Sequence, residues 1–190
     1  MIIHLIRHGE STTNKRLAHA GWAQVPLSEK GILQAKELSN KLSNKKFDKI
    51  YSSDLIRAIQ TLENALPNCP FEKSPLLRER SVGILAEKRR DDCLKEYGEL
   101  YETSRANRDF TPFGGENEDD LKNRAIEFYK SLSNKDFQNV AVFTHEGFIR
   151  ATLEIAINSL IPIGSITFPN CIVCSFELKE DKLKLLTWNE

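Results

Sequence analysis

The chain has 190 residues, which suffices for one domain with a sizeable core and a small inserted segment. Lys plus Arg and Asp plus Glu each number 27, so the net charge is near zero, and a nucleic-acid partner or an anionic membrane surface is not indicated. No apolar stretch approaches the length of a membrane span, and the apolar start ends at an arginine without the layout of a signal peptide. We therefore expect a cytoplasmic protein.

Apolar runs and helical spacings alternate along the chain. They predict a strand at residues 2–6, a helix at 28–44, a strand at 49–52 and a helix at 54–66. A highly charged helix follows from residue 87 to about 105, then a helix at 117–132, a strand at 140–144, a helix at 147–160 and closing strands at 171–178 and 183–188. Ser28 and Asn117 are the expected helix caps.

This alternation predicts an α/β fold, a three-layer α/β/α sandwich whose central sheet is mostly parallel. The rhythm breaks at about residues 76–115, which we interpret as an insertion that covers the ligand edge of the sheet within a single domain, 1–190. A strand edge near residues 171–178, or exposed apolar surface, would allow a homodimer.

The cysteines are scattered, and only Cys171 and Cys174 are close together. A single CxxC cannot complete a zinc site, and strand alternation would place these two side chains on opposite faces. We interpret all four cysteines as reduced, small hydrophobic residues, as is typical of the cytoplasm.

Two histidines follow predicted strands directly, at the edge where open α/β sheets bind ligands. They are His8, preceded by Arg7, and His145. Either one alone would be interpreted as a satisfied polar residue, and Arg57, in the first turn of a helix after a strand, as a solvated side chain. Together they form a set suited to a phosphoryl group, because guanidinium forks match its oxygens and helix starts offer free N–H groups.

Other phosphate chemistries lack their signatures in this sequence. There is no GxxxxGK[ST] loop, so nucleotide hydrolysis of the P-loop type is not indicated. No acidic cluster offers an obvious magnesium site, and no metal or other cofactor is expected.

The motif LIRHGESTTN (residues 5–14) resembles the signature of the histidine phosphatase superfamily, which includes cofactor-dependent phosphoglycerate mutases and many small-molecule phosphatases. Further segments follow in the family's order: GWAQVPLSEKG, YSSDLIRAIQT, LLRERSVG, FGGENEDDLKNR and VFTHEGFIR. The resemblance covers nearly the whole chain and implies a phosphoglycerate mutase-like fold.

The resemblance also implies roles for individual residues. His8 would be the nucleophile that becomes phosphohistidine, with Arg7, Arg57 and His145 around the phosphoryl oxygens. Asn14 would hydrogen-bond the same group. Glu79 would protonate the leaving oxygen and then activate water. Gly9 would only need to be small, so that the backbone passes close to the site. Such a ping-pong reaction needs no metal.

Within the family, the phosphatase branch fits better than the mutases. The mutases have His-Tyr where this chain has Ser81-Val82, and Thr where it has Ala20. No adjacent arginine pair is clearly placed to hold a substrate carboxylate; Arg89-Arg90 is interpreted as a solvated helix face, and Arg105 and Arg108 are not adjacent.

The ending FPNCIVCSFELKEDKLKLLTWN and the segments around Pro26 and Gly115 are similar to broad-specificity and α-ribazole phosphatases. Glu146 departs from the family, because glycine commonly follows the histidine there. If its side chain points inward, it would weaken anion binding.

The sequence thus predicts a metal-independent phosphomonoesterase acting on a small-molecule phosphate ester through phosphohistidine on His8. The alternative within enzymes is a cofactor-dependent phosphoglycerate mutase. The alternative from another class is a phosphate-ester binding protein without catalysis, which the presence of both His8 and Glu79 disfavours.

Overall fold

The computed structural model describes residues 1–158 and 166–189, and one six-stranded sheet forms its centre. The strand order is β3-β2-β4-β1-β5-β6. The strands are β1 (Ile2–Arg7), β2 (Lys49–Ser53), β3 (Glu72–Ser74), β4 (Asn139–Thr144), β5 (Val173–Lys179) and β6 (Lys182–Trp188). The first four in this order pair in parallel, and β5 runs antiparallel to both of its neighbours. The predicted mostly parallel sheet is confirmed.

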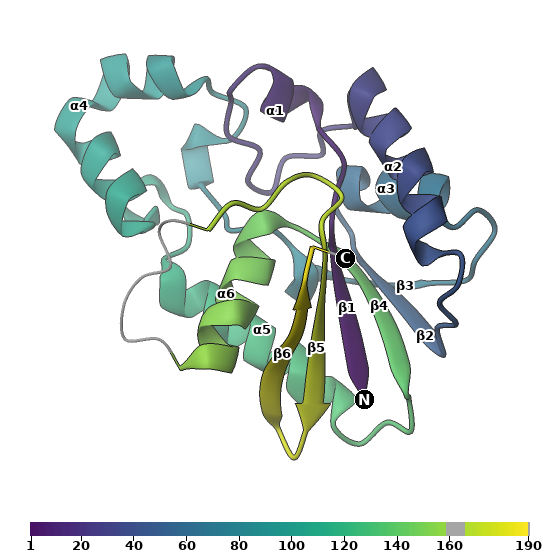
Figure 1. Cartoon of the computed structure of the whole chain (residues 1–190). Helices are drawn as coiled ribbons and strands as arrows, with labels where there is room; N and C mark the ends of the chain where they lie inside the picture. The colour runs from purple at the N-terminus through teal and green to yellow at the C-terminus, as the bar shows by residue number, and fades with distance from the viewer. Residues whose placement is uncertain (159–165, 190) are drawn as a thin grey trace.

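Helices cover both faces of this sheet (Figure 1). On one side lie α2 (Glu29–Leu42) and α3 (Ile56–Ala65), and on the other α5 (Glu118–Leu132) and α6 (Glu146–Ile157). Strand β4 shows why: Val140 and Val142 pack into the core with α5 and α6, while Ala141 and Phe143 pack against α2 and α3. A strand that is apolar at every position is buried on both faces, so the predicted three-layer sandwich is confirmed.

Most predicted boundaries lie within a few residues of the observed ones. Ser28 caps α2 by accepting from the Gly31 amide at 3.1 Å, and Asn117 caps α5 in a reciprocal capping box. Helix α3 begins at Ile56, two residues later than predicted, and the Asp54 side chain accepts from Arg78 instead of capping it. Helix α6 ends at Ile157; the predicted end at residue 160 lies outside the described residues.

The sequence pattern did not predict two short elements, helix α1 (Thr12–Lys15) and strand β3. Helix α1 is a single turn held by a capping box between Ser11 and Asn14. Strand β3 is three polar residues at the sheet edge. Neither is long enough to carry an apolar period, which is the signal that sequence reading depends on.

The segment between β3 and α5 lies beyond the carboxyl ends of the parallel strands (Figure 1). It contains three 3₁₀ turns, Pro75–Leu77, Gly83–Leu85 and Thr111–Phe113, and helix α4 (Arg90–Asn107). Helix α4 is interrupted at Gly98, where φ is 52° and ψ is −127°. A small core of its own holds this segment together, formed by Val82, Leu85, Cys93, Tyr101, Phe110 and Phe113.

Strand β5 corrects one expectation and confirms another. It lies between β1 and β6, so the sheet has no edge there; β6 is the edge strand. Cys171 and Cys174 pack into the cores on opposite faces of the sheet, as predicted, and all four cysteines are free.

Within the described ranges, no helix combines the length and the apolar character needed to cross a bilayer.

The loop after β1 passes unusually close to the first turn of α2. A Cβ atom on Gly31 would lie 2.0 Å from the Glu10 carbonyl oxygen, and one on Gly9 would lie 2.5 Å from the Gly31 carbonyl oxygen. Gly9 must therefore be small because of its contact with α2, while its carbonyl oxygen passes beside the His8 ring. Backbone touching backbone leaves no flexible side chain to give way.

We expect Gly31→Ala to lower the free energy of unfolding by about 2 kcal/mol, because the added methyl group overpacks this contact. Urea denaturation would measure the loss, with Lys36→Ala on the exposed face of α2 as the control. Equal stability of both variants would contradict the close approach of Gly31 to Glu10.

Candidate active site

The register between β1 and β4 brings the two histidines together. Arg7 pairs with Thr144 at the carboxyl ends of these parallel strands, so the next residues, His8 and His145, emerge side by side. Their ring centroids lie 5.0 Å apart. The predicted meeting of the two histidines is therefore a direct product of the sheet.

A hydrogen bond fixes the tautomer of His8. Its Nδ1 lies 2.6 Å from the Gly9 carbonyl oxygen, which can only accept, so Nδ1 carries the proton and the lone pair is on Nε2. Burial, and then the charges of Arg57 and Arg7, hold the pKa of His8 well below its usual range. A neutral imidazole with one aimed nitrogen is the form that a nucleophilic histidine needs.

Arg57 is completely buried beneath the site. Its Nε donates to His8 Nε2 at 3.3 Å, and its terminal nitrogens donate to the carbonyl oxygens of Gly21 at 2.8 Å and Ala23 at 3.1 Å. Burial lowers its pKa to about 10. Within the part of the chain that the structure describes, no carboxylate forms an ion pair with it. A buried cation without a counter-ion favours the binding of an anion.

Arg7 and His145 each present a buried nitrogen without a partner, namely Arg7 Nε and His145 Nδ1. The rest of the Arg7 guanidinium is held by the Phe168 carbonyl oxygen and by Glu146. His145 Nε2 lies 2.9 Å from Ser53 Oγ. Buried polar nitrogens without partners are rare, and two of them beside His8 mark a place for a polar ligand.

His145 is fully buried and does not line the pocket surface as Arg7, His8 and Arg57 do. Burial, then the charges of Arg57, His8 and Arg7, lowers its pKa well below the usual value. The structure thus places it against His8, one layer behind the surface.

Glu79 reaches the same pocket from the loop after the 3₁₀ turn Pro75–Leu77. Its Oε1 accepts from the amides of Arg80 at 2.8 Å and Gly147 at 3.1 Å, while Oε2 has only a 3.3 Å contact to Gly147. A Cβ on residue 147 would lie 2.1 Å from Oε1, so glycine is what allows this approach. Oε2 is the less occupied oxygen and is the one available to a ligand.

Asn14 also lines the pocket, at the end of the short helix α1. Its Oδ1 accepts from the Ser11 amide at 3.0 Å and from the Ser11 hydroxyl at 2.9 Å. This pairing leaves the Nδ2 donor for a ligand. All six residues named from the sequence therefore lie in one region, with His145 behind the surface.

Glu146 points inward, toward the cations. Its carboxylate lies 3.2 Å from Arg7 Nη2 and 3.1 Å from Arg150 Nη2, and Arg150 in turn stacks on Phe168, 4.3 Å from the ring centroid. It thus competes with any anion for Arg7 while helping to hold the guanidinium in place.

The pocket measures about 450 Å³, within the usual range for small-molecule sites. Its outer wall carries Val82 and Phe110 beside His19, Arg90 and Arg105. Burial, then the charges of Arg90 and Arg105, lowers the pKa of His19 to about 4. Arg89 and Arg90 are both exposed, as predicted for a solvated helix face, and Arg90, the first residue of α4, also lines the pocket.

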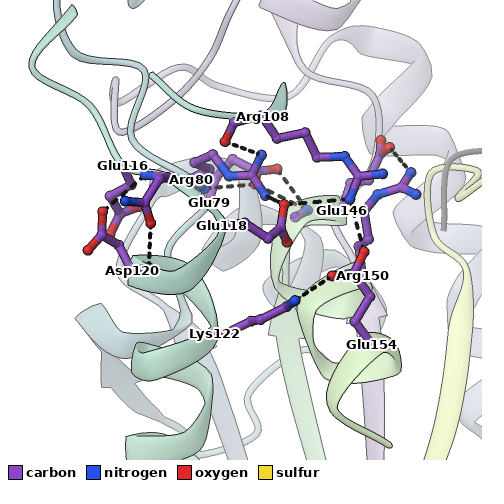
Figure 2. A network of polar contacts seen from close by, with 12 residues as sticks. Glu79, Arg80, Arg108, Glu116, Glu118, Asp120, Lys122, Glu146, Arg150 and Glu154 are labelled. Atoms are coloured by element: carbon purple, nitrogen blue, oxygen red, sulfur yellow. Dashed lines mark hydrogen bonds and ion pairs between the residues drawn. The ribbon is translucent and has the colours of Figure 1, made fainter. Parts of the chain in front are cut away.

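A network of ion pairs ties the outer wall to the helices below it (Figure 2). Arg80 contacts Glu118 at 2.7 Å, Arg108 contacts Glu154 at 3.0 Å, and Lys122 contacts Glu154 at 2.9 Å. Arg108 also lies 3.5 Å from Glu118, which joins the two halves. The segment that carries α4 is thereby fixed to both α5 and α6.

A family model described as "Histidine phosphatase superfamily (branch 1)" matches residues 3–190. The chain belongs to the histidine phosphatase superfamily. It is 34% identical over 174 residues to a 2,3-bisphosphoglycerate-dependent phosphoglycerate mutase of Bradyrhizobium sp. strain BTAi1, a match that covers 86% of this chain and 84% of the relative. It is 37% identical over 163 residues to a phosphoglycerate mutase of Schizosaccharomyces pombe, covering 80% of this chain and 77% of the relative.

Among solved structures, this superfamily member is similar to a putative α-ribazole-5'-P phosphatase of Escherichia coli K-12. The TM-score is 0.87 with 27% identity, and the match covers 100% of this chain and 96% of the other. The superfamily contains both phosphatases and mutases, so membership establishes an enzyme family rather than a particular activity.

Sequence reading missed the residues that support the predicted set. Ser53 supports His145, the Phe168 carbonyl supports Arg7, and Trp22 and Arg124 donate to the Glu79 carbonyl oxygen. Ser53 was detectable as a polar residue at the carboxyl end of a strand. The main-chain contacts have no sequence signal. Throughout residues 1–158 and 166–189, no cluster of three or more His, Cys, Asp or Glu side chains could hold a metal ion.

Glu146→Gln should tighten the binding of inorganic phosphate roughly fivefold, corresponding to about 1 kcal/mol, because it removes a negative charge beside Arg7 and keeps the side-chain shape. Isothermal titration of both proteins would measure this. Weaker binding by the variant would mean that Glu146 matters chiefly for holding Arg7 in place.

The buried histidines make stability depend on pH. Their folded pKa values lie below the ordinary 6.5, so below that pH the unfolded chain takes up protons that the folded chain does not, and stability is lost as the pH falls. We expect the free energy of unfolding to drop between pH 7 and pH 5, and to drop less in His8→Gln. Urea denaturation across this range is the measurement. Equal pH dependence in the two proteins would contradict a neutral His8.

Proposed function

We propose that this protein is a phosphomonoesterase that hydrolyses a small-molecule phosphate ester through a phosphohistidine intermediate on His8. The observation that carries the proposal is the state of His8, whose protonated Nδ1 donates to a carbonyl and whose unprotonated Nε2, in a 3.3 Å contact with Arg57 Nε, lies among buried cations. Such a nitrogen is poised to attack phosphorus, and the cations are poised to stabilise the oxygens around it.

In the first half-reaction, the lone pair of His8 Nε2 attacks phosphorus and the P–O bond to the leaving group breaks. Arg7, Arg57 and Asn14 Nδ2 neutralise or hydrogen-bond the phosphoryl oxygens. His145, in the tautomer in which the Ser53 hydroxyl donates to Nε2 and Nδ1 carries the proton, donates to the same group from behind the pocket surface. Glu79, entering as the carboxylic acid, gives its proton to the leaving oxygen. An alcohol departs, and Glu79 is left as the carboxylate.

In the second half-reaction, the Glu79 carboxylate takes a proton from water. The water oxygen attacks phosphorus, the P–N bond breaks and inorganic phosphate leaves. His8 returns to its neutral state and Glu79 to the acid, so the cycle closes without another reactant. Guanidinium and imidazole groups supply the positive charge that phosphoryl transfer requires. We further propose that the segment at 76–115 caps the pocket and selects the alcohol.

Hydrolysis, rather than transfer to a second substrate position, is supported by the outer wall. Where the resemblance gives the mutases His-Tyr, this chain presents Ser81, whose backbone is bound to Glu116, and the apolar Val82. The similarity to the putative α-ribazole-5'-P phosphatase extends over the whole chain, which makes α-ribazole phosphate the first natural ester to test.

A phosphoglycerate mutase is the second candidate, and one feature favours it. Arg90 and Arg105 face the pocket mouth, and neither forms an ion pair with a carboxylate in the described part of the chain. A substrate carboxylate would find partners there. The Bradyrhizobium and Schizosaccharomyces pombe relatives are mutases.

One assay separates these functions. The purified protein is incubated in the presence of EDTA with p-nitrophenyl phosphate, 3-phosphoglycerate and α-ribazole phosphate, beside His8→Ala. We expect phosphate release by the wild type and none by the variant, because the nucleophile is lost. Interconversion of 2- and 3-phosphoglycerate without phosphate release would establish the mutase instead. Binding of the esters without turnover would support a non-catalytic binding protein.

Glu79→Gln tests the acid role separately. We expect kcat/KM for an alkyl phosphate to fall roughly 100-fold, and kcat/KM for p-nitrophenyl phosphate to fall far less, because an aryl oxide leaves without a proton. The ratio kcat/KM reports the steps up to cleavage of the ester bond, so the later role of Glu79 as base does not obscure the comparison. An equal loss on both esters would count against Glu79 as the acid.

A further inference from the structure

Arg124 lies outside the pocket, on helix α5, and its guanidinium contacts the loop that carries Glu79. Its terminal nitrogens donate to three carbonyl oxygens of that loop, those of Leu76 at 2.8 Å, Arg78 at 3.1 Å and Glu79 at 3.2 Å. No pocket-lining atom belongs to Arg124. Its contacts therefore bear on the backbone of the loop and not on a ligand.

Glu116 completes the arrangement from the other side. Its carboxylate accepts from Arg124 Nε at 2.7 Å and Nη2 at 2.8 Å, and its Oε2 also accepts from the Ser81 amide at 2.8 Å. The Glu116 amide donates to the Ser81 carbonyl oxygen at 3.0 Å. The two side chains are only 16% and 14% exposed. Hydrogen bonds from the Arg124–Glu116 pair thus hold the loop before Glu79, at Leu76 and Arg78, and after it, at Ser81.

Only a guanidinium can make this set of contacts. The planar guanidinium of Arg124 donates to three carbonyl oxygens and to both oxygens of the Glu116 carboxylate at the same time. A lysine ammonium has only three donors, all on one nitrogen atom. Trp22 adds a fourth support, donating to the Glu79 carbonyl oxygen at 2.7 Å with its ring 4.9 Å from the Arg78 guanidinium. Both Trp22 and Arg124 therefore donate to the backbone carbonyl oxygen of Glu79, the residue whose side chain enters the pocket.

The tolerance for movement of Glu79 is small. Its Oε1 fits against Gly147 where even a methyl group would intrude to 2.1 Å, and Gly147 follows His145 and Glu146 directly. Figure 2 shows Glu79, Arg80 and Glu116 within the surrounding polar network. A shift of the loop backbone by even part of an ångström would move Oε2 relative to His8, and misplacement on this scale is costly for proton transfer.

We propose that Arg124, paired with Glu116, is a positioning residue that aims the Glu79 carboxyl at the leaving oxygen of the substrate. The proposal rests on the proposed function, in which Glu79 is the acid. It assigns Arg124 no contact with substrate. Its loss should therefore impair the proton-transfer step while the phosphoryl site formed by His8, Arg7 and Arg57 stays intact.

The test uses the full chain and the variants Arg124→Lys, Arg124→Gln and Glu116→Gln. Tyr129→Phe is the matched control, because it removes a buried hydrogen bond of the same helix, 2.6 Å to Thr152 Oγ1, without touching the loop. For each protein, kcat/KM is measured with p-nitrophenyl phosphate and with an alkyl phosphate, together with inhibition by vanadate and the melting temperature. Glu79→Gln is run in parallel.

We expect Arg124→Gln to lower kcat/KM for the alkyl ester roughly tenfold or more and that for the aryl ester less than threefold, with vanadate inhibition unchanged. Arg124→Lys, which keeps one or two of the contacts, should restore part of the alkyl activity, and Glu116→Gln should give a smaller loss of the same selectivity. Tyr129→Phe should lower the melting temperature without changing the ratio of the two esters.

Two results would overturn the proposal while leaving the proposed function standing. One is an unchanged ester ratio in all three pair variants beside a changed ratio in Glu79→Gln. The other is an equal loss on both esters with weakened vanadate inhibition, as expected of a residue that merely supports the fold. If Arg124→Gln does not fold, Arg124→Lys and Glu116→Gln decide between these results. An unchanged ratio in Glu79→Gln itself would instead remove the acid role on which both proposals depend.

Discussion

The site is organised around a positive charge that the fold has buried without an ion pair to any carboxylate among the described residues. Arg57 is fully enclosed, and its donors end on two carbonyl oxygens and a neutral imidazole. Burying a charged guanidinium costs free energy, and the hydrogen bonds to the carbonyl oxygens reduce that cost. Because carbonyl oxygens are neutral, the positive charge is kept for an anion. Burial first, and then the same charge, hold the pKa of His8 and of His145 low, so both histidines stay neutral beside the cation.

Carbonyl oxygens recur as the means by which arginines shape this site. Arg57 holds the loop at Gly21 and Ala23, Arg7 is held by Phe168, and Arg124 holds the loop before Glu79. A carbonyl fixes a guanidinium without neutralising it, whereas Glu146 fixes Arg7 and offsets its charge. Arg57 is thus held by neutral acceptors, whereas Arg7 and Arg124 each also contact a carboxylate, Glu146 and Glu116 respectively.

The sequence predicted the parts of the molecule that repeat or that recur across the family. Apolar periods located the long helices and the buried strands, and the motif around His8 and the segments after it located the six site residues. What it could not supply was contact through the main chain. Nothing in the letters indicates that Gly9 is small because of Gly31, that Ser11 binds Asn14, or that Arg124 meets three carbonyls. Nor did composition indicate which of Arg89 and Arg90 would line the pocket, since both lie in one charged run.

The pairing of Arg7 with Thr144 has a consequence for how the chain length can vary. An extra residue inside β4 would either carry His145 about 3.3 Å along the strand or turn the β4 residues on the other side of the insertion to the opposite faces of the sheet. An extra residue in the exposed turn at 133–136 would change neither. Insertions and deletions should therefore be found in that turn. The length of β4, six residues, determines how far the site lies from the turn.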